Sequence, residues 1–227
     1  MRVGLGGEFR PSRRVDGLGG LWQARRVTLE HDAWLVDLDG TLYTSPPVKL
    51  ALAAELALSG RSAVRTLRRF RSEHEHQRRT QADPTPSPYQ LQLQRTAEAL
   101  GVEAVDVELA VREWMIERPG KWLRRFRRRA LLAELEAFRT HGGRLALVSD
   151  YPARSKLDAL GCRHLFEIIV ANGEDGGPRW LKPHPDGLLS ACERLGLRPE
   201  RCLVIGDRRD ADGEAAQRAG MAFRRIG

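Results

Sequence analysis

Short apolar runs of strand length alternate with segments of helical periodicity along most of this chain. The runs occupy residues 33–36, 144–148, 166–170 and 202–205, and residues 221–226 read as a last strand. Runs that are apolar throughout are typical of strands whose two faces are both covered. Because short connections join these strands to helices, the pattern predicts an α/β fold, a Rossmann-like parallel sheet with helices on both faces.

One long helical stretch interrupts this alternation between the first and second runs. Within it, Ser87-Pro88 is a typical helix start, because a capping hydroxyl is followed by proline at the first helical position. We therefore predict an all-helical cap domain over residues 45–120. It is inserted into a core domain formed by residues 31–44 and 121–227.

Residues 1–30 are rich in Gly and Arg, and we expect them to form a flexible tail. They lack the compact apolar core of a secretory signal. No apolar stretch of the chain approaches the ~20 residues that cross a bilayer. The three cysteines, Cys162, Cys192 and Cys202, are odd in number, which argues against a disulfide framework. We expect a cytoplasmic protein with no membrane partner.

The formal net charge of +8 predicts a basic surface that attracts anions, either phosphorylated metabolites or nucleic acid. Residues 121–129 combine basic and aromatic side chains, as segments that bind single-stranded nucleic acid do. We favour the alternative, a solvated helix with Trp122 and Phe126 packed inward, so nucleic acid is an unlikely partner. The Glu-His-Glu-His run at residues 73–76 is expected to be exposed, because neighbours one and two apart on a helix do not converge.

Polar side chains follow three of the apolar runs at the point where each run ends. Asp37 and Asp39 follow the first, Ser149 the second and Asp207 the fourth. Sheets of this kind bind ligands at the carboxyl ends of their strands. Two carboxylates two residues apart repel each other and need a cation or a shared proton. The alternative for this pair is an Asp-Gly turn with solvated carboxylates.

The other polar residues each have a functional and an ordinary interpretation. Asp210 and Asp212 close behind Asp207 form an oxygen-rich cluster that suits magnesium, although acidic residues also favour helix N-termini. Ser149 offers a hydroxyl and backbone amides to a phosphate, or it is a simple helix cap. Lys182 is placed to neutralise a phosphoryl oxygen, or it is an ordinary surface lysine.

Together and in this order, the stretches resemble the four motifs of the haloacid dehalogenase superfamily. The run 37–41 (Asp-Leu-Asp-Gly-Thr) resembles the first motif, Ser149 the second, Lys182-Pro183 the third and residues 206–212 the fourth. With a helical insert between the first two motifs, the chain is similar to the phosphoglycolate phosphatase-like and β-phosphoglucomutase-like branch. In that branch the insert is a mobile cap that closes over the core and excludes water.

The resemblance implies a role for each aspartate. Asp37 would attack phosphorus and form an aspartyl-phosphate, and Asp39 would be the general acid and base. A magnesium cofactor would be held by Asp37, the backbone carbonyl of Asp39, Asp207 and Asp212. Because the dehalogenases of the superfamily lack the acid/base aspartate, Asp39 points to phosphoryl transfer.

The resemblance also implies a phosphate-binding set of Thr41, Ser149, Asp150 and Lys182. Ser149 and Lys182 would bind the remaining phosphoryl oxygens. Asp150 stands where many relatives carry Asn. Its carboxylate would add negative charge beside the phosphate, so we expect it to face away from the site.

The sequence therefore predicts a magnesium-dependent phosphatase that hydrolyses a small phosphorylated metabolite. Two alternatives stay open: a phosphomutase with the same motifs, and a non-catalytic binding protein that works through its basic surface on the same fold. The oligomeric state, monomer or homodimer, is open as well.

Overall fold

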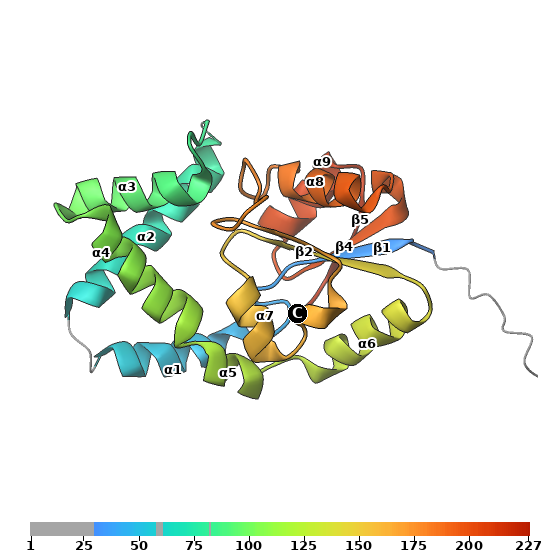
Figure 1. Ribbon diagram of the computed structural model, residues 1–227, viewed down its shortest axis with the longest axis horizontal. Coiled ribbons are helices and arrows are strands. Elements are labelled where there is room, and N and C mark those ends of the chain that lie inside the picture. Colours follow the sequence, from blue (N-terminus) through green and yellow to red (C-terminus); the bar gives the residue numbers. More distant parts are fainter. Residues whose placement is uncertain (1–29, 58–60, 82) are drawn as a thin grey trace, which may run out of the picture.

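The computed structural model describes residues 30–57, 61–81 and 83–227, so the predicted tail lies outside the described residues except for its last position (Figure 1). A five-stranded parallel sheet in the order β3-β2-β1-β4-β5 forms its centre. The strands are β1 (Ala33–Val36), β2 (Arg144–Ser149), β3 (Ile168–Ala171), β4 (Cys202–Gly206) and β5 (Ala222–Arg225). The predicted α/β class with a parallel sheet is confirmed.

Alternate strand residues enter two separate apolar layers, because successive side chains of a strand point to opposite faces. Val36 packs into one layer with Leu135 and Leu157, and Leu35 packs into the other with Leu188 and Ala215. Figure 1 shows helices covering both faces of the sheet, as the sequence pattern predicted. The covering helices are α6 (Arg129–Thr140) and α7 (Arg154–Leu160) on one face, and α8 (Asp186–Leu195) and α9 (Glu214–Arg218) on the other.

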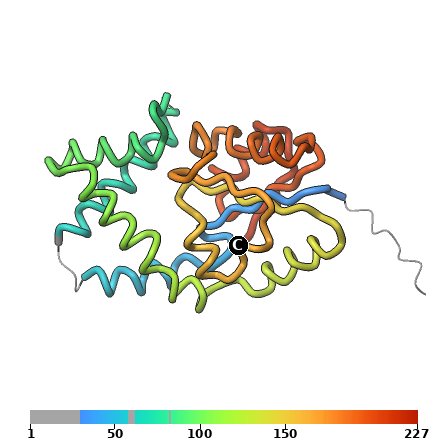
Figure 2. Tube along the Cα trace, viewed as in Figure 1, coloured from blue at the N-terminus to red at the C-terminus, as the bar shows by residue number. Residues whose placement is uncertain are grey.

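In the segment between β1 and α6, the described residues form helices and one isolated bridge, which pairs Tyr43 with Arg127. Three of the helices, α2, α3 and α4, pack around a third apolar core that includes Phe70, Leu93, Val107 and Trp114. Figure 2 shows these helices, coloured cyan to green, lying beside the sheet. The helices of the segment are α1 (Ser45–Ala57), α2 (Arg61–Thr80), α3 (Pro88–Leu100), α4 (Ala104–Val111), a π-helical continuation (Arg112–Glu117) and α5 (Gly120–Arg125).

Helix α3 begins and ends where its sequence predicts. The Ser87 hydroxyl accepts a hydrogen bond from the Gln90 amide at 3.2 Å, and Pro88 occupies the first turn. Gly101 ends the helix with a φ of 65°, in the left-handed region that favours glycine.

Strand β3, by contrast, begins two residues later than the predicted 166–170 run. Short helical turns complete the core: Arg163–Leu165, Pro199–Arg201 and the π-helical Arg209–Gly213.

The basic and aromatic segment at residues 121–129 is tied to the core rather than left free. Trp122 and Phe126 are partly buried and pack against the apolar layer that contains Val36 and Leu135, as predicted. Arg124 and Arg127 donate hydrogen bonds to backbone carbonyls at the end of α7. Cationic side chains are favourable there, because the last carbonyls of a helix carry partial negative charge.

The strand order places a topological switch point between β1 and β4. The chain leaves β1 for β2 and β3 on one side, and then returns to β4 and β5 on the other. At such a switch point the connections diverge and leave a crevice at the carboxyl edge of the sheet. The Asp37 amide donates to the Ile205 carbonyl at 2.8 Å, so the end of β1 is fixed directly beside the end of β4.

No helix within residues 30–57, 61–81 and 83–227 combines the length and apolar character needed to span a bilayer.

All three cysteines carry free thiols. Two of them are neighbours in space, with the sulfur atoms of Cys192 and Cys202 3.4 Å apart in a buried hydrogen bond.

Candidate active site

The carboxylate of Asp37 lies at the end of β1 and is almost fully buried. Its Oδ1 is 2.6 Å from the Lys182 ammonium, and its Oδ2 accepts a hydrogen bond from the Thr41 hydroxyl at 2.9 Å. Thr41 is one turn further along the Asp37–Leu42 segment and is itself fully buried. Both carboxylate oxygens of Asp37 are therefore held in fixed directions.

Two further carboxylates converge on Asp37 from the loop after β4. Oxygen atoms of Asp37, Asp207 and Asp212 all lie within 4.8 Å of one another. A Cβ on Gly40, whose φ is 101°, would lie 2.2 Å from Asp207 Oδ2, and a Cβ on Gly206 would lie 2.4 Å from the Asp212 carboxyl carbon. The two glycines therefore make room for the carboxylates, and any side chain there would displace them.

The charge balance of this cluster fits a divalent cation. Burial, together with Asp212 and Asp39, raises the pKa of Asp37 to about 8, although the Lys182 ammonium opposes the shift. Burial and Asp212 likewise raise the pKa of Asp207. Asp207 Oδ1 is buried without a hydrogen-bond partner among the described protein atoms. Hard oxygen ligands with an unused acceptor suit Mg²⁺, so these residues fit the metal that the sequence predicts.

Lys182 is the counter-charge within the cluster. Its ammonium donates to Asp37 Oδ1 and to Asp212 Oδ1, each at 2.6 Å, and to the Val148 carbonyl at 3.3 Å. Burial alone would lower the pKa of Lys182, but the two carboxylates raise it well above its usual range. The lysine is therefore charged in this environment.

Asp39 lies beside the cluster and has cationic and hydroxyl partners of its own. The Lys156 ammonium is 2.8 Å from both of its carboxylate oxygens, and the Tyr43 hydroxyl donates to Oδ1 at 2.5 Å. Burial alone would raise the pKa of Asp39, but Lys156 and Tyr43 lower it overall. Asp39 is therefore ionised in the free protein.

Ser149, the last residue of β2, and Asp150, which follows it, turn toward other groups. The Ser149 hydroxyl is buried and donates to the Tyr151 carbonyl at 2.8 Å. Asp150 Oδ1 accepts a hydrogen bond from the backbone amide of Lys182 at 3.1 Å, and its Oδ2 lies 3.8 Å from Arg78 Nε. The Asp150 carboxylate thus contacts the loop of Lys182 and helix α2.

A cavity of about 390 Å³ opens between the core and the helical segment beside these groups. On the core side it is lined by Asp39, Tyr43, Lys156, Asp207 and Arg208. The helical segment contributes both cations and apolar walls to it. These lining residues include Lys49, Leu52, Arg71, Trp114 and Met115.

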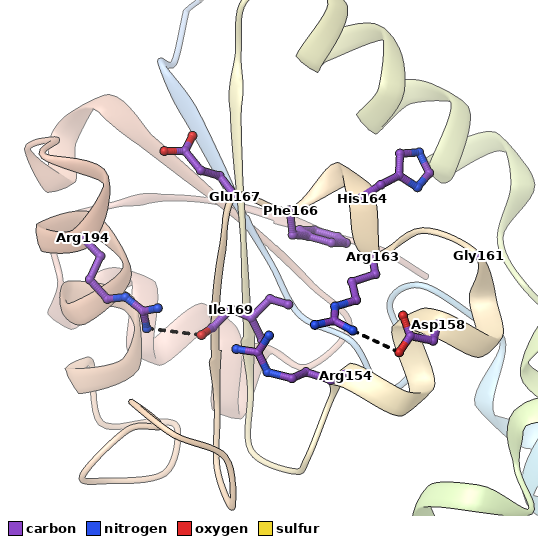
Figure 3. Close-up of a pocket in the computed structure, with 9 residues that line it drawn as sticks. All are labelled: Arg154, Asp158, Gly161, Arg163, His164, Phe166, Glu167, Ile169 and Arg194. Carbon is purple, nitrogen blue, oxygen red and sulfur yellow. Dashed lines mark hydrogen bonds and ion pairs between the residues drawn. The ribbon is translucent and has the colours of Figure 1, made fainter.

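A larger cavity, of about 660 Å³, lies at the edge of the sheet along β3 (Figure 3). Its cations are already engaged: Arg163 pairs with Asp158 at 3.3 Å, and Arg194 donates to the Ile169 carbonyl at 3.2 Å. None of the predicted site residues lines this cavity. The smaller cavity, which Asp39 and Asp207 line, is therefore the candidate substrate site.

The structure thus brings Asp37, Thr41, Lys182, Asp207 and Asp212 into one cluster. Asp39 lies at its side, whereas the side chains of Ser149 and Asp150 are engaged by neighbouring loops.

Sequence reasoning missed Lys156, Tyr43 and Arg78 as members of the site. Lys156 had a detectable signal. It lies at a spacing of three or four from Ala153 and Leu160, on the apolar face of α7 that is buried. A charged residue on the buried face of a helix requires a partner.

The expectation of an exposed Glu-His-Glu-His run is wrong for two of its members. Glu73 and His74 are buried, at 4% and 3% exposure. His74 stacks on the Tyr151 ring with centroids 4.3 Å apart. Neighbours on one helix do not converge, but α3 and the core cover this face of α2.

The family is shown by comparison with known proteins. The model of the haloacid dehalogenase-like hydrolases matches residues 31–220. The chain therefore belongs to the haloacid dehalogenase-like hydrolase family, as the four motifs indicated.

Individual relatives match over shorter stretches. A glyceraldehyde 3-phosphate phosphatase of Methanopyrus kandleri is 42% identical over 71 residues, 31% of this chain and 29% of that protein. A phosphoglycolate phosphatase of Aquifex aeolicus is 40% identical over 89 residues, 38% of this chain and 40% of that protein. The chain therefore matches less than half of the length of these curated relatives.

Solved structures share the fold over most of the chain. A β-phosphoglucomutase of Clostridium difficile superposes with a TM-score of 0.57 at 18% identity, covering 87% of this chain and 85% of that one. At this identity the likeness concerns the fold alone.

Proposed function

We propose that this protein is a magnesium-dependent phosphatase that hydrolyses a small phosphorylated metabolite through an aspartyl-phosphate intermediate. One observation carries the proposal: the carboxylates of Asp37, Asp207 and Asp212 converge at the end of β1, with Lys182 bridging two of them. The relatives named as phosphatases act on small phosphate esters, which supports the same class of substrate here.

Asp37 would be the nucleophile. One of its carboxylate oxygens attacks phosphorus while the bond from phosphorus to the leaving alcohol oxygen breaks, which forms the aspartyl-phosphate. Thr41 and Lys182 fix the direction of the attack, because each holds one oxygen of this carboxylate. Lys182 would also neutralise a phosphoryl oxygen, and Ser149 would bind another after its hydroxyl turns from the Tyr151 carbonyl.

Asp39 would transfer the proton in both halves of the reaction. Because it is ionised in the free protein, it would take a proton from solvent as the ester binds, give that proton to the leaving oxygen, and then take one from the water that attacks phosphorus and releases inorganic phosphate. Its lowered pKa suits the second half, in which it acts as a base. In the first half, the incoming phosphate dianion competes for Lys156 and weakens the contact that lowers the pKa of Asp39.

The acidic cluster would hold magnesium. The side chains of Asp37, Asp207 and Asp212 and the backbone carbonyl of Asp39 would be its protein ligands. A bound Mg²⁺ screens the carboxylates from the anionic substrate and stabilises charge on the transferring phosphoryl group.

The cavity of about 390 Å³ would receive the leaving group, since Asp39 lines it. Its size suits a small metabolite. Its lining includes four cations and three carboxylates, and this excess of cations favours a leaving group with its own negative charge. The cations are Lys49, Arg71, Lys156 and Arg208, and the carboxylates are those of Asp39, Glu75 and Asp207. We place the enzyme in the cytoplasm, where its three free thiols stay reduced.

The test is release of inorganic phosphate from a panel of esters in the presence of Mg²⁺, comparing wild type with Asp37→Asn. The panel contains phosphoglycolate, glyceraldehyde 3-phosphate, β-glucose 1-phosphate and p-nitrophenyl phosphate. We expect turnover by wild type and none detectable by Asp37→Asn, because an amide is not a nucleophile. Asp158→Asn, a surface change far from the cluster, is the control and should match wild type.

Equal rates for wild type and Asp37→Asn would refute the nucleophile. Isomerisation of the sugar phosphate without release of phosphate would identify a mutase instead. Unchanged function in Asp37→Asn, together with nucleic-acid binding that weakens as the salt concentration rises, would identify a basic binding protein.

A further inference from the structure

The position of the Lys182 ammonium depends on how its backbone is held. A lysine side chain has four rotatable carbon–carbon bonds, so its ammonium is placed accurately only if the backbone is fixed and the stem is enclosed. Lys182 is buried at 5% exposure, and its ammonium spans Asp37 and Asp212. A shift of its backbone would therefore move the only cation that touches both carboxylates among the described residues.

Side chains from two different parts of the fold hold the two backbone polar groups of Lys182. Its N–H donates to Asp150 Oδ1 at 3.1 Å, and its carbonyl accepts from Arg78 Nε at 2.7 Å. Asp150 belongs to the core, directly after β2. Arg78 belongs to α2 in the helical segment and lies 104 residues away in sequence.

Arg78 is itself held in a defined position. Its guanidinium is buried at 5% exposure, and its Nη1 donates to Glu75 Oε1 at 3.1 Å. A buried guanidinium is costly to desolvate unless its donors are well satisfied. Glu75, the partial contact with Asp150 and the Lys182 carbonyl supply those acceptors. The desolvation cost of burying the Arg78 guanidinium is therefore offset by these contacts, which also fix its position.

The same face of α2 also reaches the loop that carries Asp207. Glu75 Oε1 accepts a second hydrogen bond from Arg208 Nη1 at 3.1 Å, and Arg208 directly follows Asp207. The neighbouring His74 stacks on Tyr151 beside Asp150. One turn of α2 therefore contacts the loop after β2, the loop after β4 and the segment that carries Lys182.

We propose that Arg78 is a positioning residue for Lys182, so that the cluster is complete only when α2 is seated on the core. Arg78 does not touch the cavity or the carboxylates of the cluster. It acts by holding the Lys182 carbonyl, while Asp150 holds the amide of the same residue. The consequence for turnover rests on the proposed phosphatase function, whereas the effect on the Lys182 backbone does not.

The kinetic test compares Arg78→Ala and Arg78→Lys with Arg79→Ala. Arg79 is the adjacent, exposed arginine, and its Nε donates to the Glu75 carbonyl at 3.2 Å. With p-nitrophenyl phosphate and Mg²⁺, we expect kcat to fall about 10- to 100-fold in both Arg78 variants, with a small change in KM. Lysine does not substitute, because its ammonium lacks the planar geometry of the guanidinium. Arg79→Ala should match wild type.

Chemical rescue separates positioning from a merely structural role. Low millimolar guanidinium chloride should restore part of kcat in Arg78→Ala by occupying the vacated space, and it should leave wild type and Arg79→Ala unchanged. A loss of kcat that guanidinium does not restore would assign Arg78 to general stability and overturn the proposal. Arg78→Lys keeps the charge and the stem, and it provides the test if Arg78→Ala does not fold.

Hydrogen exchange followed by mass spectrometry tests the same inference without any substrate. The amides of residues 180–182 and of His184 should exchange faster in Arg78→Ala than in wild type, and Arg79→Ala should leave them unchanged. If wild type hydrolyses no ester, the proposed function fails but this measurement still decides the positioning role. Unchanged exchange, or faster exchange with an unchanged kcat in an active enzyme, would overturn it.

Discussion

The Lys156 ammonium lies 2.8 Å from both carboxylate oxygens of Asp39, across 117 residues of sequence. This contact lowers the pKa of the proposed acid/base residue against the effect of burial. It also fixes the direction in which the carboxylate points. The two aspartates at the end of β1 thus have separate lysines, Lys182 for Asp37 and Lys156 for Asp39.

Replacing Lys156 with methionine should slow turnover and move its pH dependence. We expect kcat to fall about 10- to 100-fold, because the Asp39 carboxylate loses its positioning partner. Without the ammonium the pKa of Asp39 rises, and a base must be ionised to act. The acidic limb of the pH–rate profile should therefore move to higher pH. Arg163→Met, which removes an exposed cation paired with Asp158, is the control; an identical profile in both variants would contradict the role.

Changing Asp39 to asparagine should leave the first half of the reaction measurable with an activated ester. The p-nitrophenolate leaving group needs no proton, so Asp37 should still be phosphorylated. Hydrolysis of the intermediate lacks its base, and steady-state kcat should fall about 10²- to 10⁴-fold. Intact-mass measurement should detect phosphorylated protein in Asp39→Asn but not in the double variant with Asp37→Asn. Near-normal turnover would exclude the acid/base role.

Removing divalent metal should abolish hydrolysis reversibly. Chelation with EDTA should stop phosphate release, and added Mg²⁺ should restore it, because the carboxylate cluster repels the substrate without a cation. Asp207→Asn should raise the Mg²⁺ concentration needed for half-maximal rate and reduce the thermal stabilisation given by Mg²⁺. Asp210→Asn is a matched control three residues on, since this exposed carboxylate pairs with Arg208. Equal metal dependence in the two variants would contradict the ligand assignment.

Replacing Gly40 with alanine should lower activity and stability for two different physical reasons. Both Gly40 and Gly142 have positive φ, 101° and 91°, so alanine at either position should lower the free energy of unfolding by about 1–2 kcal/mol. Only at Gly40 would the new Cβ meet the Asp207 carboxylate, at 2.2 Å. Gly40→Ala should therefore lose Mg²⁺-dependent activity while Gly142→Ala keeps it. Comparable activity in the two variants, measured beside chemical denaturation, would argue against this close contact.

The local sequence pattern was sufficient for the strands, the sheet class and the caps of α3. Strand residues 33–36 and 202–205 are apolar because both faces of the sheet are buried, and such burial produces a run of consecutive apolar residues that the sequence shows directly. The sequence pattern also predicted the edge of the sheet at which Asp37 and Asp207 meet, because parallel strands present their carboxyl ends at the same edge. The predicted division into a cap over residues 45–120 and a core stays a prediction.

The partners of the site residues did not follow from any local pattern. His74 was expected at the surface, because its own helix offers no convergent neighbour, yet Tyr151 and Gln92 cover it. Asp150 was expected to face away from the site, but no local pattern showed that its carboxylate would hold the backbone amide of Lys182 and lie beside Arg78.

The sequence by itself determined which residues form strands and helices, and which polar side chains end those strands, because burial periodicity and capping are properties of neighbouring residues. Only the tertiary structure decided that Lys156 meets Asp39 and that Arg78 meets the Lys182 carbonyl. Contacts across more than a hundred residues depend on how helices seat against the sheet. That seating is fixed by the packing of whole apolar faces. A cation on a buried helix face, such as Lys156, therefore signals that it has a partner but not which residue that partner is.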